Sequence, residues 1–291
     1  MALYAFDGTW NEEKDAGEYG KNTNVVKFRD AYEGRSEFYT KGVGTRYGFV
    51  GKLFGGAFGV GGKDRINQAA EQLAQYFAAG DRDIDIVGFS RGAALALHFA
   101  NTIASRGVRD RDGRVIEARP VIRFLGLWDV VAAFGIPIDL GIPFGRINLG
   151  YRLSLPGNVT YCFHALALDE RRQAFRPTRV RGGYEVWFRG VHSDISGGNG
   201  NLGLNNIALR WMLKKALAVG CPINRNALAT LDALVDPQAD ISRNLDPIKN
   251  RPRAVRATDR IHYTVTPRPN HNNPPPHAPV ESPEDEAGRL A

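Results

Sequence analysis

The chain has 291 residues, of which 43% are hydrophobic and 24% charged, and this fits one large α/β domain or two small ones in an ordinary globular protein. No apolar run is long enough to span a bilayer, no signal peptide is recognisable, and the two cysteines fit a reducing compartment, so we expect a protein that is cytoplasmic as synthesised. The net charge of +7 favours an acidic partner such as an anionic membrane surface. The sequence contains no recognisable nucleic-acid-binding module, so nucleic acid is not an expected partner. We expect the arginines scattered through 106–123, 171–181 and 243–260 to lie on a solvated surface.

The first predicted strand covers the apolar residues 3–6, and Asp7, Gly8 and Thr9 turn immediately after it. A phosphotransferase of the Asp-x-Asp-Gly-Thr type would need an aspartate at position 5, where this chain has Ala5, so that chemistry is excluded. Two interpretations stay open: an ordinary Asx turn, or a loop whose backbone N–H groups point into an active site.

Helices and strands alternate over the next part of the chain. The pattern predicts a helix over 22–32, a strand over 37–40 and a helix over 64–79. The segment 42–62 is rich in glycine and apolar residues, but Asp64 stands where a phosphate-binding loop needs Ser or Thr. We therefore interpret it as an apolar flap, a candidate cap or lid beside the site.

The most informative motif follows a branched apolar strand predicted over 84–87. Gly88, Ser90 and Gly92 form the pattern Gly-x-Ser-x-Gly, and an alanine-rich helix is predicted over 93–100. This combination is typical of a nucleophile elbow, a tight strand-to-helix turn that exposes the serine hydroxyl. The N-terminus of the helix directs backbone N–H groups at the space above Ser90, where an oxyanion is stabilised.

The remaining segments complete the predicted domain. Strands are expected over 121–129, 159–164 and 184–188, and helices over 208–218 and 224–235. Because strands alternate with helices, we predict an α/β fold with a mostly parallel central sheet and helices on both faces.

Two segments fall outside the predicted sheet and helices. The broken apolar segment 132–157 is interpreted as a second cap or acyl-contacting loop, with a buried connector as the alternative. The Pro-rich, then acidic residues 267–291 predict a disordered tail after a catalytic domain over 1–266.

Two polar side chains at predicted strand ends supply the partners that a serine nucleophile needs. Asp129 ends the strand 121–129, and His192 follows the strand 184–188. The chain order Ser90, Asp129, His192 is that of α/β-hydrolases, and parallel strands bring their ends to one edge of the sheet. His164 also ends a strand and competes with His192 as the base, while Asp194 and Asp169 compete with Asp129 as the acid.

A specific resemblance extends well beyond the serine motif. The chain resembles the α/β-hydrolase family that was long labelled a domain of unknown function and that includes phospholipase effectors of type VI secretion systems. The resemblance covers about residues 3–215. It rests on six blocks in order: Phe6–Asn11, Tyr39–Thr45, Gly88–Ala93, Leu127–Val131, His164–Glu170 and Gly190–Asp194.

The resemblance implies that Ser90 is the nucleophile, His192 the base and Asp129 the orienting acid, with the loop at Asp7 to Thr9 in the site. One departure is the segment after the His-Ser-Asp block: the family usually has a run of glycines and then tyrosine there, whereas this chain has Ile-Ser-Gly-Gly-Asn at 195–199.

We expect a serine hydrolase of carboxylic esters, lipase-like or phospholipase-like, that uses no metal or organic cofactor. The oxyanion is expected to accept hydrogen bonds from the backbone N–H groups of Arg91 and of Gly8 or Thr9, with Asp7 beside them. The alternative is a non-catalytic binding or scaffold protein of a secretion or toxin locus. Expected partners are an ester or lipid substrate, an anionic membrane surface and a secretion-system or immunity protein, and secretion would then be signal-independent.

Overall fold

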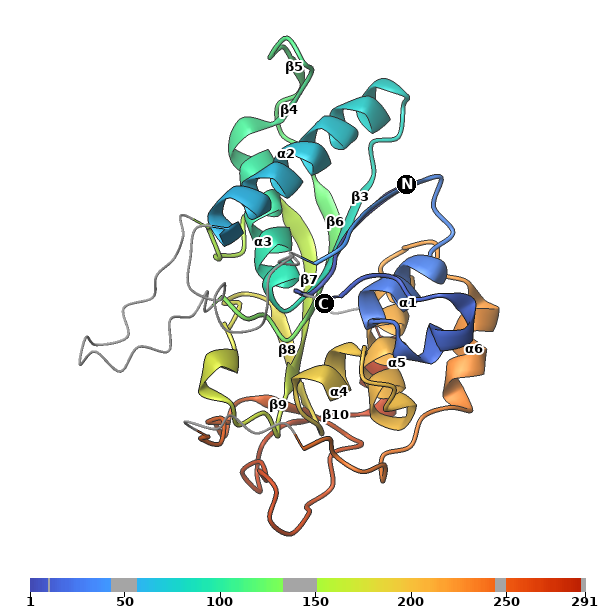
Figure 1. Cartoon of the computed structure of the whole chain (residues 1–291), viewed down its shortest axis with the longest axis vertical. Coiled ribbons are helices and arrows are strands. Elements are labelled where there is room, and N and C mark those ends of the chain that lie inside the picture. Colours follow the sequence, from blue (N-terminus) through green and yellow to red (C-terminus); the bar gives the residue numbers. More distant parts are fainter. Residues whose placement is uncertain (10, 43–56, 133–150, 244–249, 289–291) are drawn as a thin grey trace, which may run out of the picture.

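The computed structural model describes residues 1–9, 11–42, 57–132, 151–243 and 250–288. Its centre is an eight-stranded sheet in the order β10-β9-β8-β7-β6-β3-β1-β2, and each neighbouring pair of strands runs parallel (Figure 1). The strands are β1 (Ala2–Phe6), β2 (Ser36–Thr40), β3 (Ile84–Phe89), β6 (Ile122–Trp128), β7 (Val159–Ala167), β8 (Tyr184–Phe188), β9 (Arg260–His262) and β10 (Val280–Glu281). A separate antiparallel pair is formed by β4 (Val108–Arg109) and β5 (Val115–Glu117).

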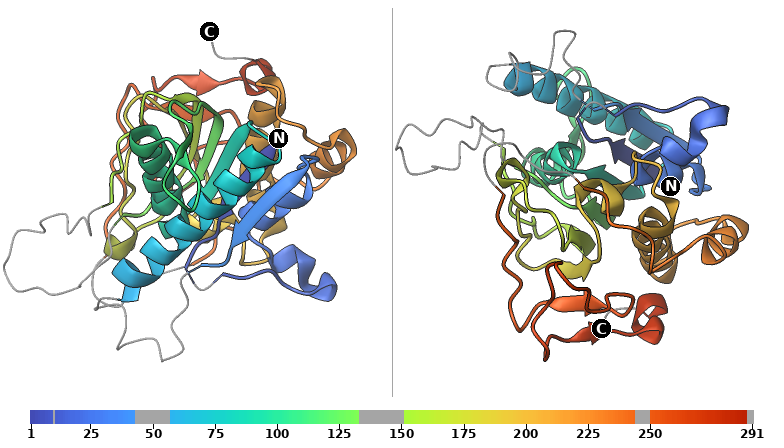
Figure 2. Two further views of the ribbon diagram at one scale, coloured as in Figure 1. Left: turned by 90° about the horizontal axis from the view of Figure 1, so that it is seen from above. Right: turned by 60° about the horizontal axis from the view of Figure 1, so that its bottom comes forward.

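Helices cover both faces of this sheet, so the prediction of an α/β-hydrolase-like fold is confirmed. Helices α2 and α3 lie on one face, whereas α1 and α5 lie on the other, with α6 outside α5 (Figures 1 and 2). The helices are α1 (Asn24–Asp30), α2 (Ala57–Ala78), α3 (Arg91–Arg106), α4 (His192–Ser196), α5 (Leu202–Ala218), α6 (Arg225–Asp232) and α7 (Pro283–Ala287), with 3-10 turns η1 (Ala16–Lys21) and η2 (Gln173–Phe175). In the described part of the chain, no helix is long and apolar enough to cross a membrane.

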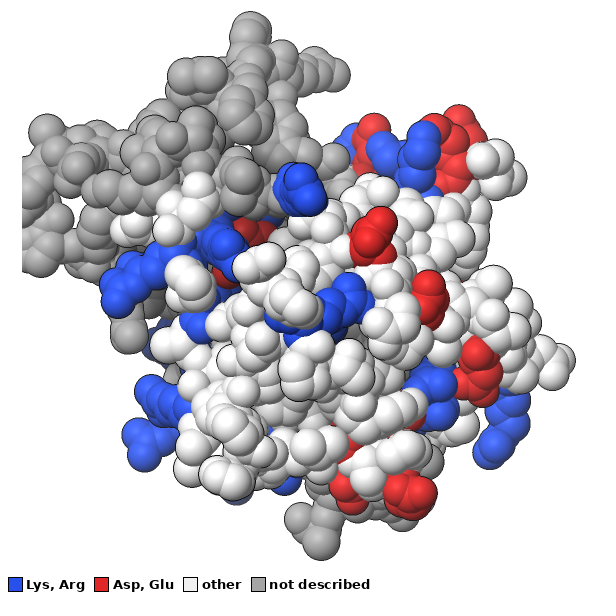
Figure 3. All heavy atoms as spheres, turned by 90° about the horizontal axis from the view of Figure 1, so that it is seen from below, with Lys and Arg blue, Asp and Glu red and all other residues white. Residues whose placement is uncertain are grey.

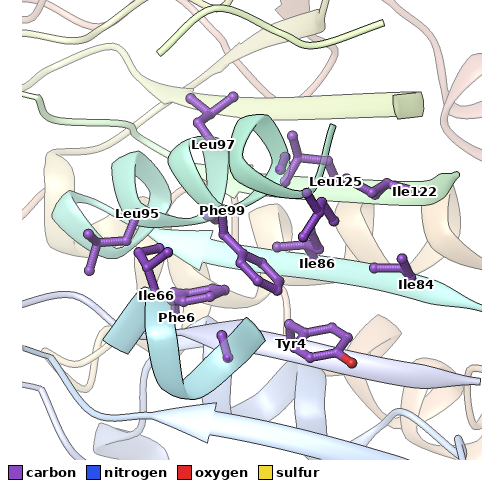
Figure 4. Close-up of a cluster of buried hydrophobic side chains, with 14 of the residues drawn as sticks. Tyr4, Phe6, Ile66, Ile84, Ile86, Leu95, Leu97, Phe99, Ile122 and Leu125 are labelled. Atoms are coloured by element: carbon purple, nitrogen blue, oxygen red, sulfur yellow. The ribbon is translucent and has the colours of Figure 1, made fainter. Parts of the chain in front are cut away.

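A hydrophobic core lies on each side of the sheet, because successive side chains along a strand point to opposite faces. In β1, Tyr4 and Phe6 face α2 and α3, and both rings pack on Phe99 with centroid separations of 5.3 and 5.6 Å (Figure 4). Leu3 and Ala5 face α1 and α5 instead. The central strands are therefore buried on both faces, which explains their nearly continuous apolar sequence.

Helix boundaries follow their capping residues. The first helix begins at Asn24 because the Thr23 hydroxyl accepts the N–H of Val26, and α6 begins after Asn224 in the same way. Helix α5 begins six residues earlier than expected. Its first turn contains the buried polar residue Asn205, whose side chain donates to the carbonyls of Ser193 and Asp194, so this turn carries no apolar periodicity.

The predicted disordered tail at 267–291 is wrong for residues 267–288. Strand β10 pairs with β9, and α7 follows with Ser282 and Asp285 as a capping box. Two of the four acidic residues that suggested a solvated tail are buried counter-ions: Glu281 lies 2.8 Å from Lys215 Nζ, and Glu286 lies 3.0 Å from an Arg210 nitrogen. Composition alone does not distinguish an acidic tail in solvent from one that neutralises buried cations.

The arginine-rich ranges are only partly on the surface, contrary to expectation. Arg123 donates to Asp85, Arg179 binds Asp259 at 2.8 Å, and Arg253 is buried. Part of the positive charge is thus neutralised inside the protein. On the face seen in Figure 3, Lys and Arg side chains lie mainly on the left and beside the undescribed atoms, and Asp and Glu mainly on the right and lower edge.

The buried Glu286 carboxylate predicts a specific stability effect. Burial alone would raise its pKa, but His262, Arg210 and Lys214 outweigh burial and hold it at about 2, below the ordinary value of 4.5. We expect Glu286→Gln to lower the free energy of unfolding by about 3 kcal/mol, because the buried Arg210 and the partly buried Lys214 lose their partner. The exposed Glu284→Gln on the same helix is the matched control.

The pH dependence of this difference follows from the lowered pKa. The stabilisation is fully present above 4.5 and is lost as the pH falls toward 2, since protonation then removes the same charge in the wild type. Urea unfolding at several pH values measures it. Equal stabilities of Glu286→Gln and Glu284→Gln at neutral pH would contradict this account.

Candidate active site

Ser90 lies at a strained turn between β3 and α3. Its backbone has φ 58° and ψ −122°, a conformation that residues other than glycine rarely adopt. A Cβ at Gly88 would lie 2.7 Å from the Cα of Ala93, and a Cβ at Gly92 would clash with the carbonyl oxygen of Phe6. Both glycines are therefore required where strand and helix approach, as the elbow motif predicts.

The structure brings Ser90, His192 and Asp129 together at the carboxyl edge of the sheet. His192 Nε2 lies 2.8 Å from Ser90 Oγ, and His192 Nδ1 lies 2.6 Å from Asp129 Oδ2. Asp129 directly follows β6, and His192 is the first residue of α4. The three side chains thus form a continuous hydrogen-bonded chain from carboxylate to hydroxyl.

The imidazole of His192 is fixed by aromatic packing and by its backbone. Its ring lies between those of Phe89 and Phe175, at centroid distances of 4.8 and 4.9 Å, and the backbone N–H of His192 donates to the Glu170 carboxylate at 3.2 Å. Burial lowers the pKa of the ring below its ordinary value, although Asp129 opposes this. The ring is therefore neutral near neutral pH, and Nε2 can accept a proton from Ser90.

The Asp129 carboxylate has a second partner that the sequence analysis missed. Arg253 donates to Oδ1 at 2.6 Å and to Oδ2 at 2.9 Å, and the N–H of Ala167 donates to Oδ1 at 3.1 Å. Burial would raise the pKa of Asp129, but Arg253 and His192 outweigh it, so the pKa is held well below its usual range.

Arg253 also ties the acid to the surrounding backbone. It donates to the carbonyls of Ala167 at 2.7 Å and Phe175 at 2.5 Å. It belongs to the basic range 243–260 that was expected on the surface, and no residue pattern around it signals burial.

The rival residues from the sequence analysis have other partners. His164 is fully buried, where Nε2 accepts the N–H of Val130 and Nδ1 lies 2.9 Å from Glu185. Asp169 binds Arg189. Asp194 accepts the N–H of Val191 at 3.1 Å and the N–H of Ser242 at 3.0 Å, and so holds the turn that carries His192.

The loop after β1 lies beside Ser90, and its residues Asp7, Gly8 and Thr9 differ in their hydrogen-bond partners. Asp7 accepts the N–H of Gly8 at 2.7 Å, the Thr23 hydroxyl at 3.0 Å and the Tyr39 hydroxyl at 2.9 Å. Burial raises the pKa of Asp7 to about 6 despite these donors. Asp7 therefore holds the loop in place, and the N–H of Gly8 is already engaged, whereas the buried Thr9 hydroxyl has no partner among the described residues.

A pocket opens between this loop, α2 and the start of α3. Its lining is mixed apolar and cationic: Phe6, Asp7, Thr9, Thr40, Gly62, Arg65, Arg91, Gly92, Leu95 and Tyr151. The predicted cap segments 42–62 and 132–157 lie mostly outside the described residues, as does Trp10. Across the described ranges, no group of three or more His, Cys, Asp or Glu side chains is arranged to hold a metal ion.

Comparison with known proteins identifies a protein family that matches this chain. A family model described as "T6SS, Phospholipase effector Tle1-like, catalytic domain" matches residues 3–118 and 109–215. No curated protein sequence matches the chain significantly.

Two solved structures are similar. "Crystal structure of an uncharacterized protein from Pseudomonas aeruginosa" is 24% identical with a TM-score of 0.50, covering 76% of this chain and 46% of that one. "Structure of the Tle1 effector bound to the VgrG spike from the Type 6 secretion system" is 24% identical with a TM-score of 0.48, covering 69% and 51%. The chain thus spans about half the length of each.

The contact between Arg253 and Asp129 predicts a shift in the titration of His192. Arg253 lowers the pKa of the His192 ring through its charge, so Arg253→Met should raise that pKa. Ring-nitrogen NMR over a pH titration measures it. Arg251→Met, which removes an exposed arginine two residues away, is the control and should leave the pKa as in the wild type.

A second variant separates charge from folding. Arg253→Lys keeps the charge and should return the His192 pKa toward the wild-type value. An unchanged His192 pKa in folded Arg253→Met would contradict the electrostatic coupling.

Proposed function

We propose, since the chain belongs to the family of Tle1-like phospholipase effectors of type VI secretion through their catalytic domain, that it is a serine hydrolase of the carboxylic esters of lipids. The observation that carries this proposal is the hydrogen-bonded chain from Asp129 through His192 to Ser90. Family membership favours a phospholipid as the substrate. The geometry supports the same chemistry independently, because this arrangement is the one that nucleophilic acyl transfer needs.

The reaction begins when Ser90 Oγ attacks the ester carbonyl. The Ser90 proton passes to His192 Nε2 as the new C–O bond forms, and the carbonyl oxygen becomes an oxyanion. As the tetrahedral intermediate collapses, the ester C–O bond breaks and His192 returns the proton to the departing alkoxide. Water then attacks the acyl-enzyme with His192 again as base, which releases a carboxylic acid and regenerates the Ser90 hydroxyl.

Asp129 serves this cycle by fixing the imidazole. Its contact with Nδ1 selects the tautomer in which Nε2 is unprotonated, and its negative charge stabilises the imidazolium that forms during attack. Arg253 and the N–H of Ala167 keep the carboxylate ionised and oriented. Arg253 is therefore a positioning residue that acts through Asp129.

The oxyanion is stabilised by backbone N–H groups of Arg91 and Thr9. Arg91 begins α3, where the helix N-terminus favours negative charge. Gly8 was the alternative to Thr9, but its N–H donates to Asp7, which favours Thr9. Each such donor contributes about 3 kcal/mol to lowering the barrier.

Delivery and partners follow from the family and remain part of this proposal. We expect export by a type VI secretion apparatus in contact with one of its components, and an immunity protein in the producing cell. The catalytic role of Ser90 separates this function from that of a non-catalytic scaffold with the same fold.

The proposal predicts that Ser90 is required for lipid hydrolysis. We expect Ser90→Ala to reduce fatty-acid release from mixed phosphatidylethanolamine and phosphatidylglycerol vesicles by about four orders of magnitude or more. Mass spectrometry of the lipid products measures it. Ser105→Ala, an exposed position toward the end of α3, is the control and should retain wild-type turnover. Equal release by Ser90→Ala and the wild type would rule out this function.

A further inference from the structure

The pocket beside Ser90 contains more positive charge than an ester carbonyl needs. Arg91 directly follows Ser90, and Arg65 approaches from α2. Both guanidinium groups are partly buried, and burial lowers the pKa of Arg91 to about 10 and also lowers that of Arg65. A guanidinium removed from water, such as that of Arg65, is costly unless an anion pairs with it.

Arg65 is oriented by backbone rather than by an acid. Its Nε donates to the carbonyl of Lys41 at 3.0 Å, and Nη1 donates to the carbonyl of Gly61 at 2.9 Å. Among the described residues no carboxylate accepts a hydrogen bond from Arg65, although Asp64 lies near enough to act on its charge. The side chain is thus fixed in place while its charge stays available to the pocket.

The other polar groups of the pocket also favour an anion. Thr9 lines it, is only 8% exposed, and has a buried hydroxyl without a partner among the described residues. The N-terminus of α3 adds backbone N–H groups. Among the described residues that line the pocket, Asp7 is the one acid, and its carboxylate already accepts three hydrogen bonds.

We propose that this pocket binds the phosphate group of a glycerophospholipid headgroup while Ser90 attacks an acyl ester of the same molecule. The inference rests on the proposed hydrolase function and adds the feature of the substrate that the pocket recognises. A phosphate has enough oxygens to accept from the Arg65 fork and the Thr9 hydroxyl together, whereas a neutral glyceride offers no such acceptor. Only a few bonds separate the phosphate from the acyl carbonyl in a glycerophospholipid, which matches a pocket that adjoins the nucleophile.

The test compares a charged and an uncharged substrate with the same acyl chains. We measure kcat/KM for phosphatidylglycerol and for diacylglycerol in the same neutral detergent micelles. In Arg65→Gln, the ratio of the two values should fall about tenfold, because one charge-assisted contact to phosphate is lost. Arg111→Gln removes an equal charge from the exposed β4–β5 turn and should leave the ratio unchanged.

A second variant guards against a folding defect in Arg65→Gln. Thr9→Val keeps the shape and the N–H of residue 9 but removes the unpartnered hydroxyl, so it should also lower the ratio. An unchanged ratio in both variants, with Ser90-dependent hydrolysis of both esters intact, would overturn the phosphate site and leave the hydrolase function standing.

A binding measurement identifies the source of the phosphate and does not depend on turnover. Ser90→Ala protein is titrated calorimetrically with glycerophosphoglycerol, the water-soluble headgroup, and separately with inorganic phosphate. Headgroup binding that weakens about tenfold in Ser90→Ala/Arg65→Gln supports the proposal. Binding of inorganic phosphate alone, or of neither ligand, overturns it, whereas loss of all Ser90-dependent hydrolysis with headgroup binding retained overturns only the hydrolase function.

Discussion

The buried carboxylate of Asp129 is the interaction on which the site depends. It accepts from His192, from the backbone of Ala167 and from both terminal nitrogens of Arg253, so four segments of chain meet at one group. A buried carboxylate with these donors stays ionised, and an ionised carboxylate holds one tautomer of the imidazole. The orientation of His192 toward Ser90 follows from that tautomer and from the ring packing around it.

The central sheet determines where these segments meet. Parallel strands place their carboxyl ends at one edge, so Ser90 after β3 and Asp129 after β6 become neighbours although the chain between them is long. Both residues have positive φ, as does no other non-glycine residue in the described chain except Asn270. Strain at two such positions persists because the sheet and the adjoining helices hold the backbone there.

Local features of the sequence could be predicted, and long-range charge pairing could not. The glycines at 88 and 92 identify the elbow because each is required by a contact within a few residues or with the adjacent strand. Arg253 and Glu286 show the opposite case. Each is buried by a partner far away in sequence, and a charged residue looks the same in sequence whether solvent or a counter-ion surrounds it. Strands β9 and β10 escaped prediction because they are too short to show a period.

The most direct test of the account is covalent labelling of the wild-type protein with a fluorophosphonate, followed by peptide mass mapping. A serine made nucleophilic by His192 and Asp129 should carry one phosphonyl group, and that group should be on Ser90. An unlabelled protein, or a label on a serine other than Ser90, would contradict the claim that this hydrogen-bonded chain activates the hydroxyl.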